Sequence, residues 1–201
     1  TDYPGLVPKL CLRPEADIKA GTPLFYDKYH PDVQFTSPVS GKLISINRGE
    51  RRKILELIIE PSGEMEYEQF EVADPNTLKA EDIRHTLLAS GVWPFIRQRP
   101  YHVVADPKLT PRAVFISGFD TAPLGPDYDF IFGNEDGTAF QTGINALKKL
   151  TNAPVHLSLQ DGYPAAPAMA NAGGVEFHTF KGPHPAGNVG IQIHHIQPVN
   201  K

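Results

Sequence analysis

The first 60 residues place short apolar runs between Pro, Gly and Asn, a pattern typical of short β-strands joined by tight turns. The last run, Lys53 to Ile59, alternates imperfectly, so we expect a strand whose second face is half covered rather than a solvated edge. Pro61-Ser62-Gly63 ends it. This part of the chain therefore predicts a small all-β unit with strands over residues 6–12, 24–26, 33–35, 42–46 and 53–59.

An acidic stretch follows this unit. Residues 64–71 contain four Glu, and Asp74-Pro75-Asn76 favours a turn. We therefore place a boundary near residue 75, which divides the chain into a β domain over 1–75 and a second domain over 76–201.

Beyond the boundary the apolar spacing becomes that of helices. Thr77 is a candidate N-cap for a first helix, and Gly91 is a natural stop for it. Residues 136–150 form the clearest helix, because Phe140, Ile144 and Leu147 fall on one face.

Short runs of β-forming residues flank that helix. The order strand, helix, strand over residues 112–117, 136–150 and 155–159 indicates a Rossmann-like α/β unit. Residues 175–180 and 189–197 predict two more strands. The predicted fold class is therefore α+β: an all-β domain followed by an α/β domain.

Composition narrows the functional classes. The 201 residues are 40% hydrophobic and carry a formal charge of -4, which suits a globular chain and disfavours nucleic-acid binding. The longest apolar stretches fall short of the roughly 20 residues that cross a bilayer. A single cysteine, Cys11, excludes an internal disulfide and fits a reducing compartment.

Common catalytic and metal-binding patterns are missing. The sequence holds no G-x-S-x-G nucleophile elbow, and residues 117–123, after the strand 112–117, lack a glycine-rich phosphate loop. His194 and His195 are adjacent, so on a strand they would face opposite sides. We read His178, His184 and His194 as structural and predict no metal site.

Two segments remain as candidates for surface function. Residues 93–101 alternate aromatic and basic side chains, which with a net charge of -4 favours a packed or docking segment over a nucleic-acid groove. The loop Gly182 to Gly187 presents one imidazole, His184, on a backbone fixed by two prolines.

The β domain also resembles the lipoyl and biotinyl carrier fold. The resemblance rests on Asp27-Lys28-Tyr29, on the Ser37-Pro38-Val39-Ser40-Gly41 turn, and on residues 18–25. It would make Lys28 the modified lysine. His30-Pro31-Asp32 lengthens the hairpin tip and no Met-Lys-Met is present, so we expect Lys28 to be an ordinary surface lysine and keep the carrier module as the alternative.

Seven segments in order make a more specific resemblance, to the family of the A subunit of the bacterial sodium-translocating NADH:quinone oxidoreductase. They span nearly the whole chain: Tyr3 to Gly5, Phe35 to Gly41, Ile46 to Glu50, Ser90 to Trp93, Arg97 to Pro100, Asp120 to Leu124, and Gly182 to Gly187. Family members are longer at both ends, so we expect a piece that lacks a first segment and a C-terminal region.

The resemblance implies a barrel-sandwich-hybrid β domain followed by a Rossmann-like domain without a glycine-rich nucleotide loop. It implies a peripheral subunit on the cytoplasmic face of the bacterial inner membrane, docked on the integral subunit that holds the quinone site, while other subunits oxidise NADH and move sodium.

Related subunits carry a flavin loop where this chain has Ser90 to Arg97, whose bulky side chains would block a phosphate. We therefore expect no covalently bound cofactor here and no independent catalysis. Quinone would lie at the interface with the integral subunit, near Trp93, Phe95, Arg97 and His184. An independent NADH or flavin enzyme is a third interpretation, and it requires a chromophore on the purified protein.

Overall fold

The computed structural model describes residues 2–133 and 136–199. Its contacts divide the chain into two compact units. The first holds residues up to Val72 together with Arg84–Leu109, and the second holds Ala73–Ile83 together with residues from Thr110 onward. Segment 84–109 thus packs with the β strands, although it lies beyond residue 75 in sequence.

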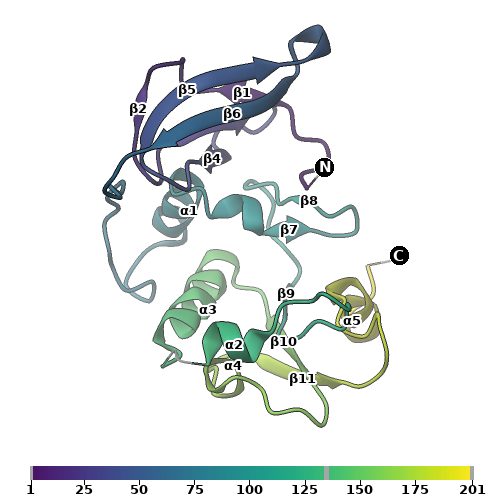
Figure 1. Ribbon diagram of the computed structural model, residues 1–201. Coiled ribbons are helices and arrows are strands. Elements are labelled where there is room, and N and C mark those ends of the chain that lie inside the picture. Colours follow the sequence, from purple (N-terminus) through teal and green to yellow (C-terminus); the bar gives the residue numbers. More distant parts are fainter. Residues whose placement is uncertain (1, 134–135, 200–201) are drawn as a thin grey trace. The chain divides into compact units, whose positions relative to one another are not determined.

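The first unit contains two three-stranded antiparallel sheets (Figure 1). Their neighbouring strands follow the orders β1-β3-β4 and β2-β5-β6. The bounds are β1 (Pro8–Leu10), β2 (Asp17–Ile18), β3 (Pro23–Asp27), β4 (Gln34–Thr36), β5 (Gly41–Arg48) and β6 (Ile54–Pro61), with a 3-10 turn η1 (Glu50–Arg52) at the tip of the β5–β6 hairpin. The predicted all-β unit is confirmed.

Apolar residues from both sheets form the core of this unit. Val33 and Leu43 are almost fully buried. The ring of Phe35 stacks on Phe25 with centroids 4.7 Å apart and meets Tyr3 edge-on at 4.9 Å. These are the offset and edge-to-face arrangements that aromatic rings prefer.

Strand β6 differs from its prediction. Leu55 is 61% exposed and Ile58 is 44% exposed, so β6 is a solvated edge strand rather than one with a half-covered second face. The alternate residues Glu56, Ile58 and Glu60 are exposed, so one face of its pleat meets solvent, as is common in antiparallel sheets.

The segment after the sheets begins with a helix that starts later than predicted. Helix α1 (Ala80–Ala89) begins beyond Thr77, so Thr77 is not its N-cap. The backbone N–H and hydroxyl of Thr77 instead donate to the carbonyl of Asp74 and close a turn. Gly91 ends the helix as predicted, with φ at +73° and its N–H donating to Leu88.

Three short elements complete the first unit. They are the 3-10 turn η2 (Trp93–Phe95) and the hairpin of β7 (Arg97–Gln98) and β8 (Val103–Val104). The Thr36 hydroxyl of β4 donates to the Ser90 carbonyl at 3.5 Å, which ties this segment to the β strands.

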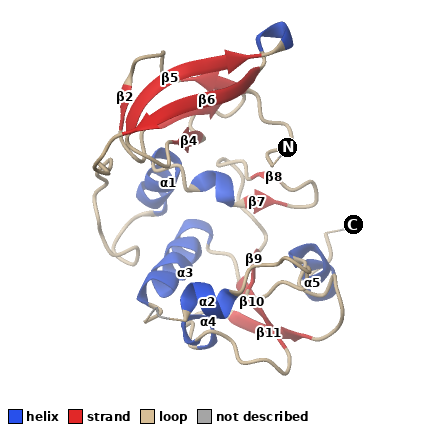
Figure 2. Ribbon diagram, viewed as in Figure 1, coloured by secondary structure: helices blue, strands red, loops and turns tan. Residues whose placement is uncertain are grey.

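The second unit is a three-stranded parallel sheet with helices, shown in Figure 2. Each strand pairs with the next in the sequence, and the order is β11-β10-β9. The predicted strand-helix-strand unit is confirmed. The elements are β9 (Val114–Ser117), α2 (Tyr128–Phe132), α3 (Thr138–Thr151), β10 (Val155–Gln160), α4 (Pro167–Ala170), β11 (Glu176–Phe180) and α5 (Val189–Ile196).

The two faces of this sheet are covered differently. Leu157 packs with Ile144 of α3 and Met169 of α4 in a buried apolar cluster. The alternate positions point the other way, where the Ser117 hydroxyl accepts a hydrogen bond of 2.9 Å from the buried amide of Gln192 in α5. Side chains at alternate strand positions face opposite sides, so α3 and α5 lie on opposite faces.

The prediction of a strand over residues 189–197 was wrong, because these residues form helix α5. The Asn188 side chain accepts from the N–H of Gly190 and caps the helix. Burial of Gln192 and Ile193 overrides the strand preference of the isoleucines. Among the described residues, no helix is long and apolar enough to cross a membrane.

Candidate functional site

The segment 93–101 turns two of its three predicted site residues inward. Trp93 is buried, and its indole N–H donates to the Ala105 carbonyl at 2.8 Å. The guanidinium of Arg97 lies 4.2 Å above the ring of Tyr3 and donates to the Asp2 carbonyl at 3.0 Å. Trp93 and Arg97 therefore hold the fold together within the first unit.

Phe95 is the outward-facing member of this group. Its side chain is 73% exposed, and Tyr101 in the following turn is 81% exposed. A large exposed aromatic ring suits contact with an apolar ligand or a partner surface. Phe95 is thus the one residue of the three that is available for such contact.

His184 lies in the second unit, on the loop after β11. Its Nδ1 is 3.2 Å from the Thr121 hydroxyl, which also accepts the N–H of Gly187 at 3.0 Å. The Cβ of any larger residue at Gly187 would collide with the backbone of Asp120 and Thr121. The loop is therefore fixed against the chain that follows β9, and the imidazole is exposed.

A pocket of about 190 Å³ opens where β9 and β10 end. Ligands of open α/β sheets bind at this edge. Its walls come from two loops and include Gly118, Asp120, Asp127, Tyr128, Gln160 and Tyr163. The negative charges of Asp120 and Asp127 in its wall disfavour the binding of an anionic phosphate. Partial burial, and then the nearby charge of Asp120, raise the pKa of the Tyr128 hydroxyl.

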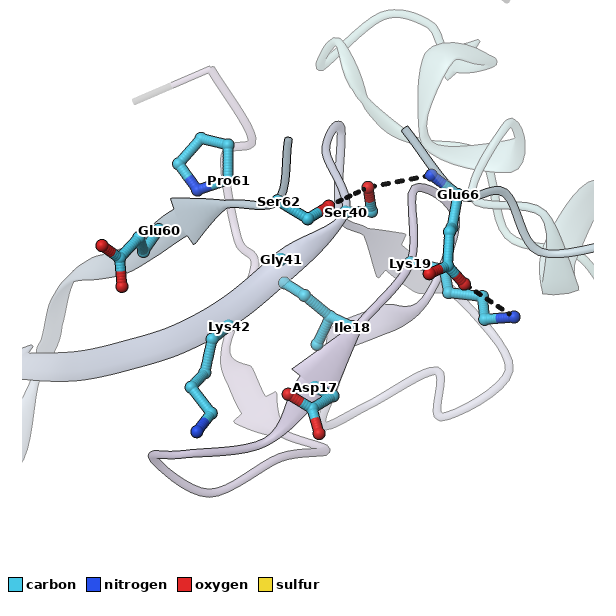
Figure 3. A pocket seen from close by; sticks show the side chains of 10 residues that line it. All are labelled: Asp17, Ile18, Lys19, Ser40, Gly41, Lys42, Glu60, Pro61, Ser62 and Glu66. Carbon is cyan, nitrogen blue, oxygen red and sulfur yellow. Dashed lines mark hydrogen bonds and ion pairs between the residues drawn. The ribbon is translucent and has the colours of Figure 1, made fainter. Parts of the chain in front are cut away.

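A larger pocket of about 410 Å³ lies in the first unit (Figure 3). Its polar groups are mostly bonded to one another. The buried hydroxyl of Ser40 accepts the N–H of Glu66 at 2.9 Å and lies 2.8 Å from the Ser62 hydroxyl. Lys19 pairs with the Glu66 carboxylate at 3.2 Å. These contacts hold the acidic stretch against the sheet. The polar groups of this pocket therefore stabilise the fold.

Lys28 lies in the turn between β3 and β4. Its side chain is exposed, with Nζ 5.5 Å from the ring centroid of Tyr29, and its N–H donates to Val7. The strands pair up to Tyr26 and Gln34, so the turn is longer than a two-residue hairpin. The structure thus exposes Lys28 on an extended tip.

A group of side chains that sequence analysis missed lies on neighbouring strands. His156 of β10 is buried beside Glu176 and His178 of β11. His178 is predicted from the sequence to be a structural histidine and is weighed there only together with His184. Two alternating polar positions in consecutive strands, His156 with Ser158 and Glu176 with His178, are the signal that could have revealed it.

The environment of His156 favours its neutral form. Burial lowers the pKa of its imidazole, the Glu176 carboxylate acts against this, and the second imidazole of His178 lowers the pKa further. The ring of Phe115 stacks on His156 with centroids 4.8 Å apart and holds its orientation.

Comparison with known proteins places most of the chain in one family. Residues 1–62 match the model described as the NqrA N-terminal barrel-sandwich hybrid domain, and residues 78–201 match the NqrA second alpha/beta domain. The chain belongs to the NqrA family. The predicted resemblance is confirmed, as is the fold class of a barrel-sandwich hybrid domain followed by an α/β domain.

Curated relatives of this NqrA chain are named as the A subunit of the Na(+)-translocating NADH-quinone reductase. The protein of Yersinia pseudotuberculosis serotype O:1b (strain IP 31758) is 39% identical over 202 residues, covering all of this chain and 44% of the relative. Those of Photorhabdus laumondii and Vibrio vulnificus (strain YJ016) are each 36% identical over 201 residues, covering 99% of this chain and 44% of the relative. The chain therefore spans less than half the length of the relatives it matches.

Proposed function

We propose that this NqrA chain acts as part of a peripheral subunit of a sodium-pumping respiratory NADH:quinone oxidoreductase. It would lie on the cytoplasmic face of the bacterial inner membrane and bind the integral subunit that holds the quinone site. The observation that carries this is the match of residues 1–62 and 78–201, in order, to two domains of one family whose relatives bear that enzyme's name.

The contacts of the candidate residues refine the quinone part of the proposal. Trp93 and Arg97 are engaged within the first unit, so they would support the surface rather than touch quinone. Phe95 offers an exposed ring, and His184 an exposed imidazole that can hydrogen-bond a carbonyl. These two are the residues that would contact the integral subunit or the quinone at its interface.

The test uses the whole complex, purified with the full-length subunit carrying Phe95→Ala or His184→Gln. The expected result is a complex that still assembles, with the KM for quinone raised at least about threefold by one of the variants. Val72→Ala, which truncates an exposed apolar side chain outside these segments, is the control. Unchanged KM in both variants would remove the quinone role, and failure of the chain to co-purify with sodium-dependent activity would remove the subunit role.

We also propose that this chain binds no nicotinamide or flavin nucleotide. Support comes from the two aspartates at the edge where the second unit would hold a phosphate. The purified chain should be colourless, and added NADH, FAD and FMN should leave its melting temperature unchanged. A rise that depends on nucleotide concentration would contradict this and favour an independent flavin or NADH enzyme.

A carrier module modified on Lys28 is the second candidate, because that lysine is exposed on the β3–β4 turn. Intact mass of the protein from its native host separates the two. A mass equal to that of the sequence is expected. A lipoyl or biotinyl adduct that Lys28→Arg abolishes would establish the carrier.

A further inference from the structure

Three potential ligand atoms converge on one face of the parallel sheet. His156 Nδ1 is 3.0 Å from His178 Nε2 and 3.3 Å from Glu176 Oε2, and all three atoms lie within 4.8 Å of one another. Both contacts of His156 are made through the same ring nitrogen.

The strand register produces this arrangement. In the parallel pair, His156 lies opposite Glu176, and Ser158 lies opposite His178. Residues two apart share a face, so Glu176 and His178 point to the same side as His156. Glu176 is the first residue of β11 and His156 is the second residue of β10, which places the group near the amino-terminal edge of the sheet. The pocket near Asp120 lies at the opposite, carboxyl-terminal edge.

Hydrogen bonding within the group either shares one proton between two acceptors or brings two electron-rich atoms together. An imidazole Nδ1 either donates one proton or accepts one. If it donates to the Glu176 carboxylate, that proton also faces His178 Nε2, and if it accepts from His178, its lone pair faces the carboxylate. A cation at the centre would instead accept a lone pair from all three atoms.

We propose that His156, Glu176 and His178 bind a single divalent transition-metal ion of the Zn²⁺ type. Tetrahedral Zn²⁺ with bonds of about 2.0–2.1 Å has ligand atoms about 3.3 Å apart, close to the two separations found here. Two imidazoles and one carboxylate are ligands that Zn²⁺ takes, whereas Ca²⁺ and Mg²⁺ favour sets made of oxygen.

The surroundings would hold one ligand ring in place and leave a route by which the ion can enter. Stacking on Phe115 fixes the His156 ring, while the Glu176 side chain is 63% exposed and leaves one side open to solvent. Three protein ligands leave a fourth position for water or a ligand from another molecule. The ion would also join β11, at the edge of the sheet, to β10 at its centre.

The test is a Zn²⁺ titration of the full chain, prepared without a histidine tag and stripped with a chelator, in competition with a chromophoric chelator. One Zn²⁺ per chain is expected, with a rise in melting temperature that EDTA reverses. His178→Gln should weaken binding by at least about 100-fold and Glu176→Gln by at least about tenfold, because changes outside a ligand set already cost roughly 10–100-fold.

His194→Gln is the matched control, since it removes an exposed imidazole from α5 in the same unit and should leave Zn²⁺ affinity unchanged. Glu176→Gln changes an exposed side chain of equal size, so it decides the result if His178→Gln does not fold. Absence of stoichiometric Zn²⁺ binding by the unmodified chain would overturn the proposal. Equal affinity in the Glu176→Gln, His194→Gln and unmodified chains would also overturn it.

Discussion

The indole N–H of Trp93 donates a 2.8 Å hydrogen bond to the carbonyl oxygen of Ala105, twelve residues further along the chain. This bond joins η2 to the segment after β8, and Trp93 itself is 5% exposed. A residue that sequence analysis placed near a quinone is thus a core residue of the first unit.

Replacement of Trp93 should destabilise the protein. Trp93→Phe leaves the Ala105 carbonyl without its donor and should lower the free energy of unfolding by about 1–3 kcal/mol, and Trp93→Ala by about 3–5 kcal/mol. Urea denaturation followed by circular dichroism measures both. Phe95→Ala, two residues away and exposed, should stay within about 0.5 kcal/mol of the unmodified chain. Equal losses at positions 93 and 95 would contradict the assignment.

A methyl group at Gly91 should also destabilise the first unit. Gly91 has φ at +73°, and a Cβ there would overlap the Thr36 side chain. Gly91→Ala should therefore cost about 1–3 kcal/mol. Gly63→Ala is the control, because an added Cβ at that position meets no atom within 4 Å. Thermal unfolding that ranks the two variants the other way would exclude this steric account.

Alanine substitutions at two neighbouring positions of α3 should change the stability of the protein in opposite directions. Ile144→Ala opens a cavity beside Leu157 and should cost about 2–5 kcal/mol. Gly143 is exposed on the same helix with open space at its Cβ, so Gly143→Ala should stabilise by about 0.5–1 kcal/mol. Denaturant midpoints of the two variants give the comparison, and a loss of stability from Gly143→Ala would show that its surface is not free.

His102 should titrate below an ordinary histidine. Partial desolvation, and then the positive charges of Arg99 and Arg97, lower the pKa of its imidazole. The unfolded chain takes up this proton at a higher pH than the folded chain. The group's contribution to stability is therefore present above the ordinary pKa and is lost as pH falls through the lowered one. NMR titration should show the shift, and Arg99→Gln should raise the pKa; no change in that variant would exclude the charge effect.

Much of the fold followed from local patterns. The period of Phe140, Ile144 and Leu147 predicted α3, and the apolar run before Gly118 predicted β9, because a buried face leaves a regular mark in sequence. The sequence pattern of helix α5 was misleading. Its isoleucines at 191 and 193 alternate like a strand, and only tertiary packing of Gln192 against Ser117 shows that it is a helix.

The candidate site was predicted less well, because side-chain direction depends on tertiary contacts. Alternation of aromatic and basic residues at 93–101 indicated surface function, but Tyr3 covers Arg97 from a position 94 residues away. Likewise, His156 and Glu176 are 20 residues apart, and only the register of β10 with β11 makes them neighbours.

The first unit is built from two separate segments of the sequence, and this affects how it folds during synthesis on the ribosome. A ribosome delivers the strands up to Val72 well before it delivers Arg84–Leu109. Until then Thr36 lacks its contact with Ser90, and Tyr3 lacks Arg97. The β-rich first part of the nascent chain therefore stays incomplete until about 37 further residues, 73–109, have been synthesised.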